Sequence, residues 1–123
     1  MIQPRTLVTI ADNTGARIGR IFKVLGGSRR RYARIGDLVV LSVQVAEPRK
    51  TVKKKEVLQA VVVRQKQPFR RKDGSYVRFD DNAVVILEKG KKEPKAGRIF
   101  GPMPRELAEA GYQKIISLAS EVV

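Results

Sequence analysis

The 123-residue chain contains no cysteine and no histidine. Without cysteine it cannot form a disulfide, and without either residue it lacks the usual ligands of zinc and haem iron. Histidine is also the side chain that most often acts as a general base near neutral pH. We therefore expect no cofactor and no bound metal, and these absences argue against many classes of enzyme.

The chain also lacks a run of about 20 apolar residues, which is the length that crosses a bilayer. Its first residues carry no apolar stretch of the kind found in secretory signals. The adjacent aspartates Asp80 and Asp81 lie where a turn is expected, and neighbours on an extended chain point to opposite faces. They are therefore poorly placed to share an ion, and the sequence predicts a non-enzymatic protein that does not enter a membrane.

Positive charge is what the chain has in abundance. It carries 26 lysines and arginines against 12 acidic residues, a net charge of +14. Four segments, residues 29–34, 49–55, 64–72 and 89–98, hold 19 of these 26 cations and a single acidic residue. Because ordinary solvated surfaces mix the two signs, the segregation predicts contact with a polyanion such as RNA.

Aromatic residues are few and scattered, which indicates how RNA would be bound. Binding of single strands by stacking needs several aromatics on one sheet face. We expect Phe22, Phe79 and Phe100 in the core, while Tyr32 either stacks on a base or packs at the edge of the core. The expected mode is therefore phosphate and shape recognition. The predicted RNA-contacting residues are Arg17, Arg29, Arg30, Arg31, Tyr32, Arg34, Arg49, Lys50, Lys53, Lys54, Lys55, Arg64, Lys66, Arg70, Arg71, Lys72, Arg78, Lys91, Lys92 and Lys95.

Short β-rich segments recur along the chain and predict strands at residues 7–11, 18–25, 38–45, 57–64 and 83–88. In the third segment Val39, Leu41, Val43 and Val45 should share the buried face. Residues 18–25 also fit helical spacing, but their β-branched residues and flanking glycines favour a strand. The segment 57–64 is apolar on both faces, so it should be central. Regularly spaced short strands predict a mainly β fold built on a small closed barrel.

A β-hairpin is predicted at residues 64–79, because Asp73-Gly74 suits the two-residue type I′ turn. We expect Val77 and Phe79 to enter the core and Arg78 to face the partner. Proline and glycine bound a short helix at residues 104–111, beside which an apolar segment at 115–118 should pack. The chain is then one domain, with a barrel over about 1–100, a ribbon over about 64–79 and a helical part over about 101–123.

One spaced pattern resembles the signature of a known family. It consists of Ala60-Val61-Val62-Val63, nine residues, Asp73-Gly74, four residues, Phe79, two residues, Asn82, two residues and Val85-Ile86. It is similar to the signature of the universal L-fourteen family of large-subunit ribosomal proteins. Other segments resemble that family in the expected order, namely residues 11–17, 23–28, 32–33, 98–102, 105–107 and 114–119.

The resemblance implies a closed five-stranded β-barrel, a projecting β-hairpin and a short C-terminal helical region. It implies a cytoplasmic protein of the large ribosomal subunit that binds large-subunit rRNA directly. It also implies a place at the subunit interface, where members help form intersubunit bridges to small-subunit rRNA. The implied protein neighbours belong to the L-nineteen and L-three families.

The resemblance further implies that a ribosomal silencing factor docks near Gly97, Arg98 and Lys114. Arg98 and Lys114 match the family, whereas Gly97 stands where the family usually has threonine and Gln113 where it has methionine. Lys50 and Ser120 also replace the family's usual glycine and proline. The alternative from the residues alone is a free-standing basic small-barrel RNA chaperone or regulator.

Overall fold

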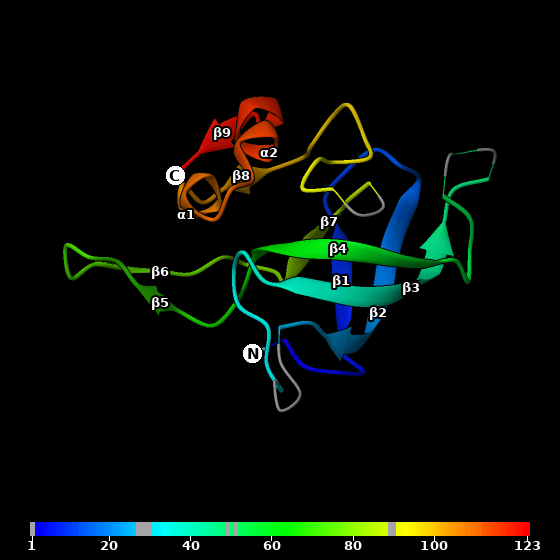
Figure 1. The fold of residues 1–123 in the computed structure, drawn as a ribbon, viewed down its shortest axis with the longest axis horizontal. Coiled ribbons are helices and arrows are strands. Elements are labelled where there is room, and N and C mark those ends of the chain that lie inside the picture. Colours follow the sequence, from blue (N-terminus) through cyan, green and yellow to red (C-terminus); the bar gives the residue numbers. More distant parts are fainter. Residues whose placement is uncertain (1, 27–30, 49, 51, 89–90) are drawn as a thin grey trace.

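Five strands close into a barrel in the order β1-β2-β3-β4-β7. The computed structural model describes residues 2–26, 31–48, 50, 52–88 and 91–123. The barrel strands are β1 (Leu7–Ile10), β2 (Ala16–Val24), β3 (Leu38–Ala46), β4 (Val57–Arg64) and β7 (Ala83–Ile86) (Figure 1). β1 pairs with β7 in parallel, and the other barrel pairs are antiparallel. The predicted barrel is confirmed, and closure leaves its sheet without free edges.

Two irregularities in the β2–β3 pairing decide which side chains enter the barrel. Ile18 pairs with Val45 but Gly19 pairs with Val43, so β3 carries an extra residue at this point. The extra residue shifts the alternation, and Val45 is 45% exposed although the sequence predicted it to be buried. On β2, Phe22 lies between the paired residues Ile21 and Lys23 and is 50% exposed, so its prediction as a core residue was wrong.

From Ala60 to Arg64, β4 is buried on both faces, as its sequence predicts. Ala60 and Val62 belong to the barrel interior, whereas Val61 and Val63 belong to a second apolar cluster on the outside of the barrel. That second cluster includes Met103, Leu107, Tyr112 and Ile115 of the C-terminal part. The apolar outer face of β4 therefore holds the C-terminal part against the barrel.

The C-terminal part contains β8 (Pro102–Met103), α1 (Glu106–Glu109), α2 (Gln113–Leu118) and β9 (Glu121–Val122), with β8 and β9 paired in parallel. The predicted helix at 104–111 is confirmed as α1, which is followed by Gly111 at φ +95°. The apolar segment at 115–118 is also helical, within α2. Among the described residues, no helix is long and apolar enough to cross a membrane.

A ribbon of two short strands, β5 (Phe69–Arg70) and β6 (Tyr76–Val77), projects from the barrel (Figure 1). Its turn is not type I′, because Gly74 has φ +89° but Asp73 does not adopt positive φ. Instead the Gly74 N–H donates to the Arg71 carbonyl over 3.0 Å. The Asp73 carboxylate accepts hydrogen bonds from the Ser75 N–H and hydroxyl, and these bonds lower the pKa of Asp73.

The remaining aromatic predictions fare differently. Phe100 is 46% exposed, so its prediction as a core residue was wrong. Phe79 and Val77 are half-buried and line a cleft between the ribbon and the C-terminal part, outside both apolar clusters. The hairpin leaves the barrel before these residues, which is why their alternation does not lead into its core.

Candidate nucleic-acid interface

Three of the four basic segments lie on different sides of the molecule. Figure 1 places the ribbon at the left, the β3–β4 connection at the right and the stretch leading into β3 near the N-terminus at the bottom. Exposed cations in the described parts of these segments are Arg31, Arg34, Lys50, Lys53, Lys54, Lys55, Lys66, Arg70, Lys72 and Arg78. Tyr32 is 45% exposed. Arg29, Arg30 and Arg49 lie outside the described residues.

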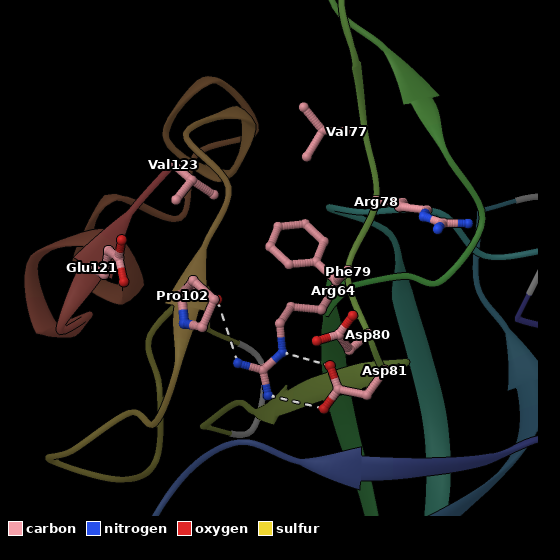
Figure 2. A pocket seen from close by; sticks show the side chains of 9 residues that line it. All are labelled: Arg64, Val77, Arg78, Phe79, Asp80, Asp81, Pro102, Glu121 and Val123. Carbon is pink, nitrogen blue, oxygen red and sulfur yellow. Dashed lines mark hydrogen bonds and ion pairs between the residues drawn. The ribbon is translucent and has the colours of Figure 1, made fainter.

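Arg64 does not belong to this exposed set, because its side chain is only 9% exposed. Its Nε lies 3.0 Å from Oδ1 of Asp81, and Nη2 donates to Oδ2 over 3.3 Å. Nη1 donates to the carbonyls of Phe100 at 3.0 Å and Pro102 at 3.4 Å. Figure 2 shows the contacts of Arg64 with Asp81 and Pro102 in the cleft between the ribbon and the C-terminal part. The Arg64 guanidinium is therefore occupied within the fold and is poorly placed for the phosphate contact that the sequence predicted.

Arg71 is also turned inward, with a side chain 13% exposed. Its Nε donates to Oε1 of Glu106 over 2.6 Å, and Nη2 donates to the Val123 carbonyl over 2.7 Å. The residue thus ties the ribbon to α1 and β9. Its neighbours Arg70 and Lys72 are exposed, and Arg78 points away from the cleft in Figure 2.

The described part of the loop before Ile99, residues 91–98, contacts α2 and the turn that precedes α2. The Lys92 ammonium lies 5.4 Å from the centre of the Tyr112 ring and donates to the Ala110 carbonyl over 3.3 Å. Lys114 pairs with Glu93 at 3.5 Å. Lys91 is exposed and Lys95 half-buried, while Gly97 and Arg98 are exposed. The Glu93–Lys114 pair therefore brings the loop that carries Gly97 and Arg98 next to the helix that carries Lys114.

Arg17 is already paired, since its Nη2 donates to Oε1 of Glu47 over 2.7 Å and its Nε donates to the same oxygen. This pair is exposed, and the hydrogen bond from Arg17 holds the pKa of Glu47 below its ordinary value. An exposed ion pair adds little to stability. Arg17 thus remains accessible to RNA but shares its charge with a carboxylate.

Asp12 is a buried carboxylate that is not among the site residues predicted from the sequence. Its Oδ1 accepts hydrogen bonds from the Thr14 N–H at 3.2 Å and hydroxyl at 2.7 Å, and its Oδ2 accepts from the Ile86 N–H at 2.9 Å. Burial raises the pKa of Asp12, although these three hydrogen bonds oppose the rise. The residue fastens the end of β1 to β7, next to the parallel pair that closes the barrel.

No cluster of three or more potential metal ligands occurs in the described part of the chain. The molecule is a β-scaffold whose exposed charged side chains, in the part of the chain that the structure describes, are mainly cationic. In chemical terms such a surface neutralises phosphates, and direct sequence reading would need additional base contacts.

A comparison with protein-family models identifies the scaffold. The model described as "Ribosomal protein L14p/L23e" matches residues 1–123, which is the whole chain. Proteins of that family are structural, non-enzymatic constituents of the large ribosomal subunit, in the cytoplasm. The family suggested by the signature residues is thus confirmed: this chain belongs to the L14p/L23e family of large-subunit ribosomal proteins.

Proposed function

We propose that the protein binds large-subunit rRNA directly through lysine and arginine contacts to phosphates. The observation that carries the proposal is the exposure of the ribbon and β3–β4 cations. Lys53, Lys54, Arg70, Lys72 and Arg78 are exposed, and no salt bridge joins any of them to another described residue. The backbone of the ribbon and of the β3–β4 connection is already folded, so RNA binding has to order little more than these side chains.

The family resemblance and the charge distribution together support a place at the subunit interface. Cations on three sides of the molecule allow contact with more than one RNA helix, including small-subunit rRNA across an intersubunit bridge. Protein neighbours of the L-nineteen and L-three families belong to the same proposal. The free-standing RNA chaperone is disfavoured, because the family is one of large-subunit constituents.

We place the silencing-factor surface at Gly97, Arg98 and Lys114. The loop and α2 meet through the Glu93–Lys114 pair, which supports a shared surface. A Cβ added at Gly97 would have no heavy atom within 4 Å, so the threonine usual in the family fits there without a clash. Its absence in this chain removes contact area from the proposed surface without changing the scaffold.

The experiment is to measure the affinity for the protein's own large-subunit rRNA as a function of salt. The test variant combines Arg70→Gln, Lys72→Gln and Arg78→Gln, and leaves the structural Arg71 in place. The logarithm of the binding constant falls linearly with the logarithm of salt concentration, by roughly 0.7–0.9 per phosphate neutralised. We expect the variant's slope to be shallower by about 2 and its affinity to be lower.

A charge-matched control combines Arg5→Gln, Arg20→Gln and Lys23→Gln, which remove three charges outside the four basic segments. The control should keep most of the slope, because loss of net charge alone does not remove defined phosphate contacts. An unchanged slope in the ribbon variant, or equal losses in both variants, would contradict the assignment of these contacts to the ribbon.

A further inference from the structure

A cleft of about 400 Å³ opens beside the start of β2. Its volume falls in the range of about 300–1,000 Å³ typical of ligand sites. Its lining includes the apolar residues Ile10, Ala16 and Phe100, and its polar rim consists of Asn13, Arg17 and Lys50 together with Thr9, Asp12 and Glu47. The cleft thus combines one aromatic side chain with polar and charged groups.

Phe100 supplies the aromatic wall. Its backbone is fixed, because the Phe100 N–H donates to the Ala11 carbonyl over 2.7 Å, and Ile99 is bridged to Asp12. The Arg98 guanidinium lies 5.5 Å from the centre of the Phe100 ring but does not line the cleft. The Arg98 guanidinium therefore makes a cation–π contact with the Phe100 ring from outside the cleft, while 46% of Phe100 stays exposed.

The rim carries groups that complement a nucleotide. The Asn13 side chain is exposed, and no hydrogen bond joins its amide to another described residue, so it can both donate and accept. Arg17 and Lys50 bring two positive charges, against the one exposed carboxylate of Glu47, which accepts from Arg17. The second acidic residue in the lining, Asp12, is buried and occupied by three donors.

We propose that this cleft receives one unstacked nucleotide of large-subunit rRNA. The base lies against the Phe100 ring, the Asn13 amide faces the base edge, and Lys50 and Arg17 face the flanking phosphates. The inference rests on the proposed rRNA binding and adds a specific site to it. RNA is favoured over an apolar protein segment because Arg17 and Lys50 border the cleft, and aromatic side chains are what proteins use to stack splayed-out bases.

The test compares aromatic and aliphatic side chains of similar size at one position. Phe100→Leu keeps an apolar group but removes the π face, whereas Phe100→Tyr keeps both. Stacking on an aromatic side chain is worth roughly a 5- to 100-fold change in affinity per base. We expect Phe100→Leu to weaken binding to the protein's own large-subunit rRNA by about that factor, and Phe100→Tyr to restore it.

Two further readouts separate stacking from a loss of folding or of charge. The salt slope should be unchanged in Phe100→Leu, because stacking neutralises no phosphate. Chemical probing should show one nucleotide that the native protein protects at its base and that Phe100→Leu leaves reactive. Asn13→Ala, which alters an exposed side chain, should weaken the same protection.

The outcomes distinguish this site from the broader proposal. If native binding shows no salt dependence, rRNA binding through phosphates fails and the cleft proposal fails with it. If native binding is salt-dependent but Phe100→Leu binds as tightly as Phe100→Tyr and protects the same bases, only the nucleotide cleft is overturned. If Phe100→Leu lowers the thermal midpoint, Asn13→Ala becomes the deciding variant. The same protection of bases by Asn13→Ala as by the native protein then also overturns the proposed nucleotide site.

Discussion

Arg64 gives the sharpest prediction, because one side chain joins the barrel, the ribbon and the C-terminal part. We expect Arg64→Met to destabilise the fold and to loosen the attachment of both appendages. Methionine keeps an unbranched apolar stem, so the change removes the charge and the hydrogen bonds with little loss of packing. What is lost is the contact with Asp81 and the bonds to the Phe100 and Pro102 carbonyls.

The magnitude follows from burial. Removing one partner of a fully buried ion pair costs about 3–5 kcal/mol, because the other charge is left without compensation. Asp81 is 38% exposed and regains water, so its part of the penalty is smaller. The hydrogen bonds from the charged guanidinium contribute about 1.5–3 kcal/mol each at most. We therefore expect the free energy of unfolding to fall by about 2–3 kcal/mol.

The assay is urea unfolding of the full chain, with Arg17→Met as the matched control. Arg17 makes a contact of 2.7 Å with Glu47, but its side chain is 65% exposed. Such a surface pair is worth about 0–1 kcal/mol, so the same substitution there should cost little. Amide exchange gives a local readout. The Phe79 N–H, bonded to the Gln65 carbonyl, and the Phe100 N–H, bonded to Ala11, should exchange faster in Arg64→Met.

The reasoning is refuted if Arg64→Met and Arg17→Met destabilise the protein equally. It is also refuted if Arg64→Met leaves amide exchange at Phe79 and Phe100 unchanged. The Phe79 N–H is bonded to Gln65, the residue after Arg64, and the Phe100 carbonyl accepts from the guanidinium itself. Asp81→Asn keeps the shape of the acceptor and removes its charge. In a double-mutant cycle with Arg64→Met it should show coupling of about 1 kcal/mol or more.

Three further predictions test other parts of the molecule. Asp12→Asn should lower the free energy of unfolding by about 1–3 kcal/mol in urea, because asparagine replaces one of the two acceptor oxygens with an NH2 donor, which then faces either the Ile86 N–H or the Thr14 donors. Burial raises the pKa of Asp12 in the native state above its ordinary value of 3.8. Between these two pKa values the native state therefore binds more protons than the unfolded state. The contribution of Asp12 to the free energy of unfolding should therefore fall as the pH rises through this range. Urea unfolding of the native protein and of Asp12→Asn at several pH values checks this. Gly74 has φ +89°, and a Cβ added there would meet no heavy atom within 4 Å, so Gly74→Ala should cost about 1 kcal/mol through backbone strain alone. Amide exchange of the N–H at position 74 measures this cost. Gly97→Thr should tighten binding of the silencing factor in a pull-down titration while leaving the thermal midpoint within about 1 °C, as expected for an open surface site; no gain in affinity would argue against docking at this loop.

The sequence by itself determined the barrel, the ribbon and the family. Alternating β-branched residues fix which segments become strands, and Val61 and Val63 on the outer face of β4 already require a cover such as the C-terminal part. The signature residues and the basic segments are local patterns that need no contact map. Family membership and the cationic surface could therefore be predicted, and α1 could be placed from its proline and glycine.

Only the tertiary structure decided what individual side chains do. Arg64, Arg70, Arg71 and Lys72 look alike as neighbouring cations, yet two of them are buried in internal pairs, because Asp81 and Glu106 approach from elsewhere in the chain. Likewise Phe100 borders a cleft, while the extra residues in the β2–β3 pairing turn Val45 outward. Local periodicity sets the type of an element, but burial and pairing depend on neighbours distant in sequence, and only folding brings those together.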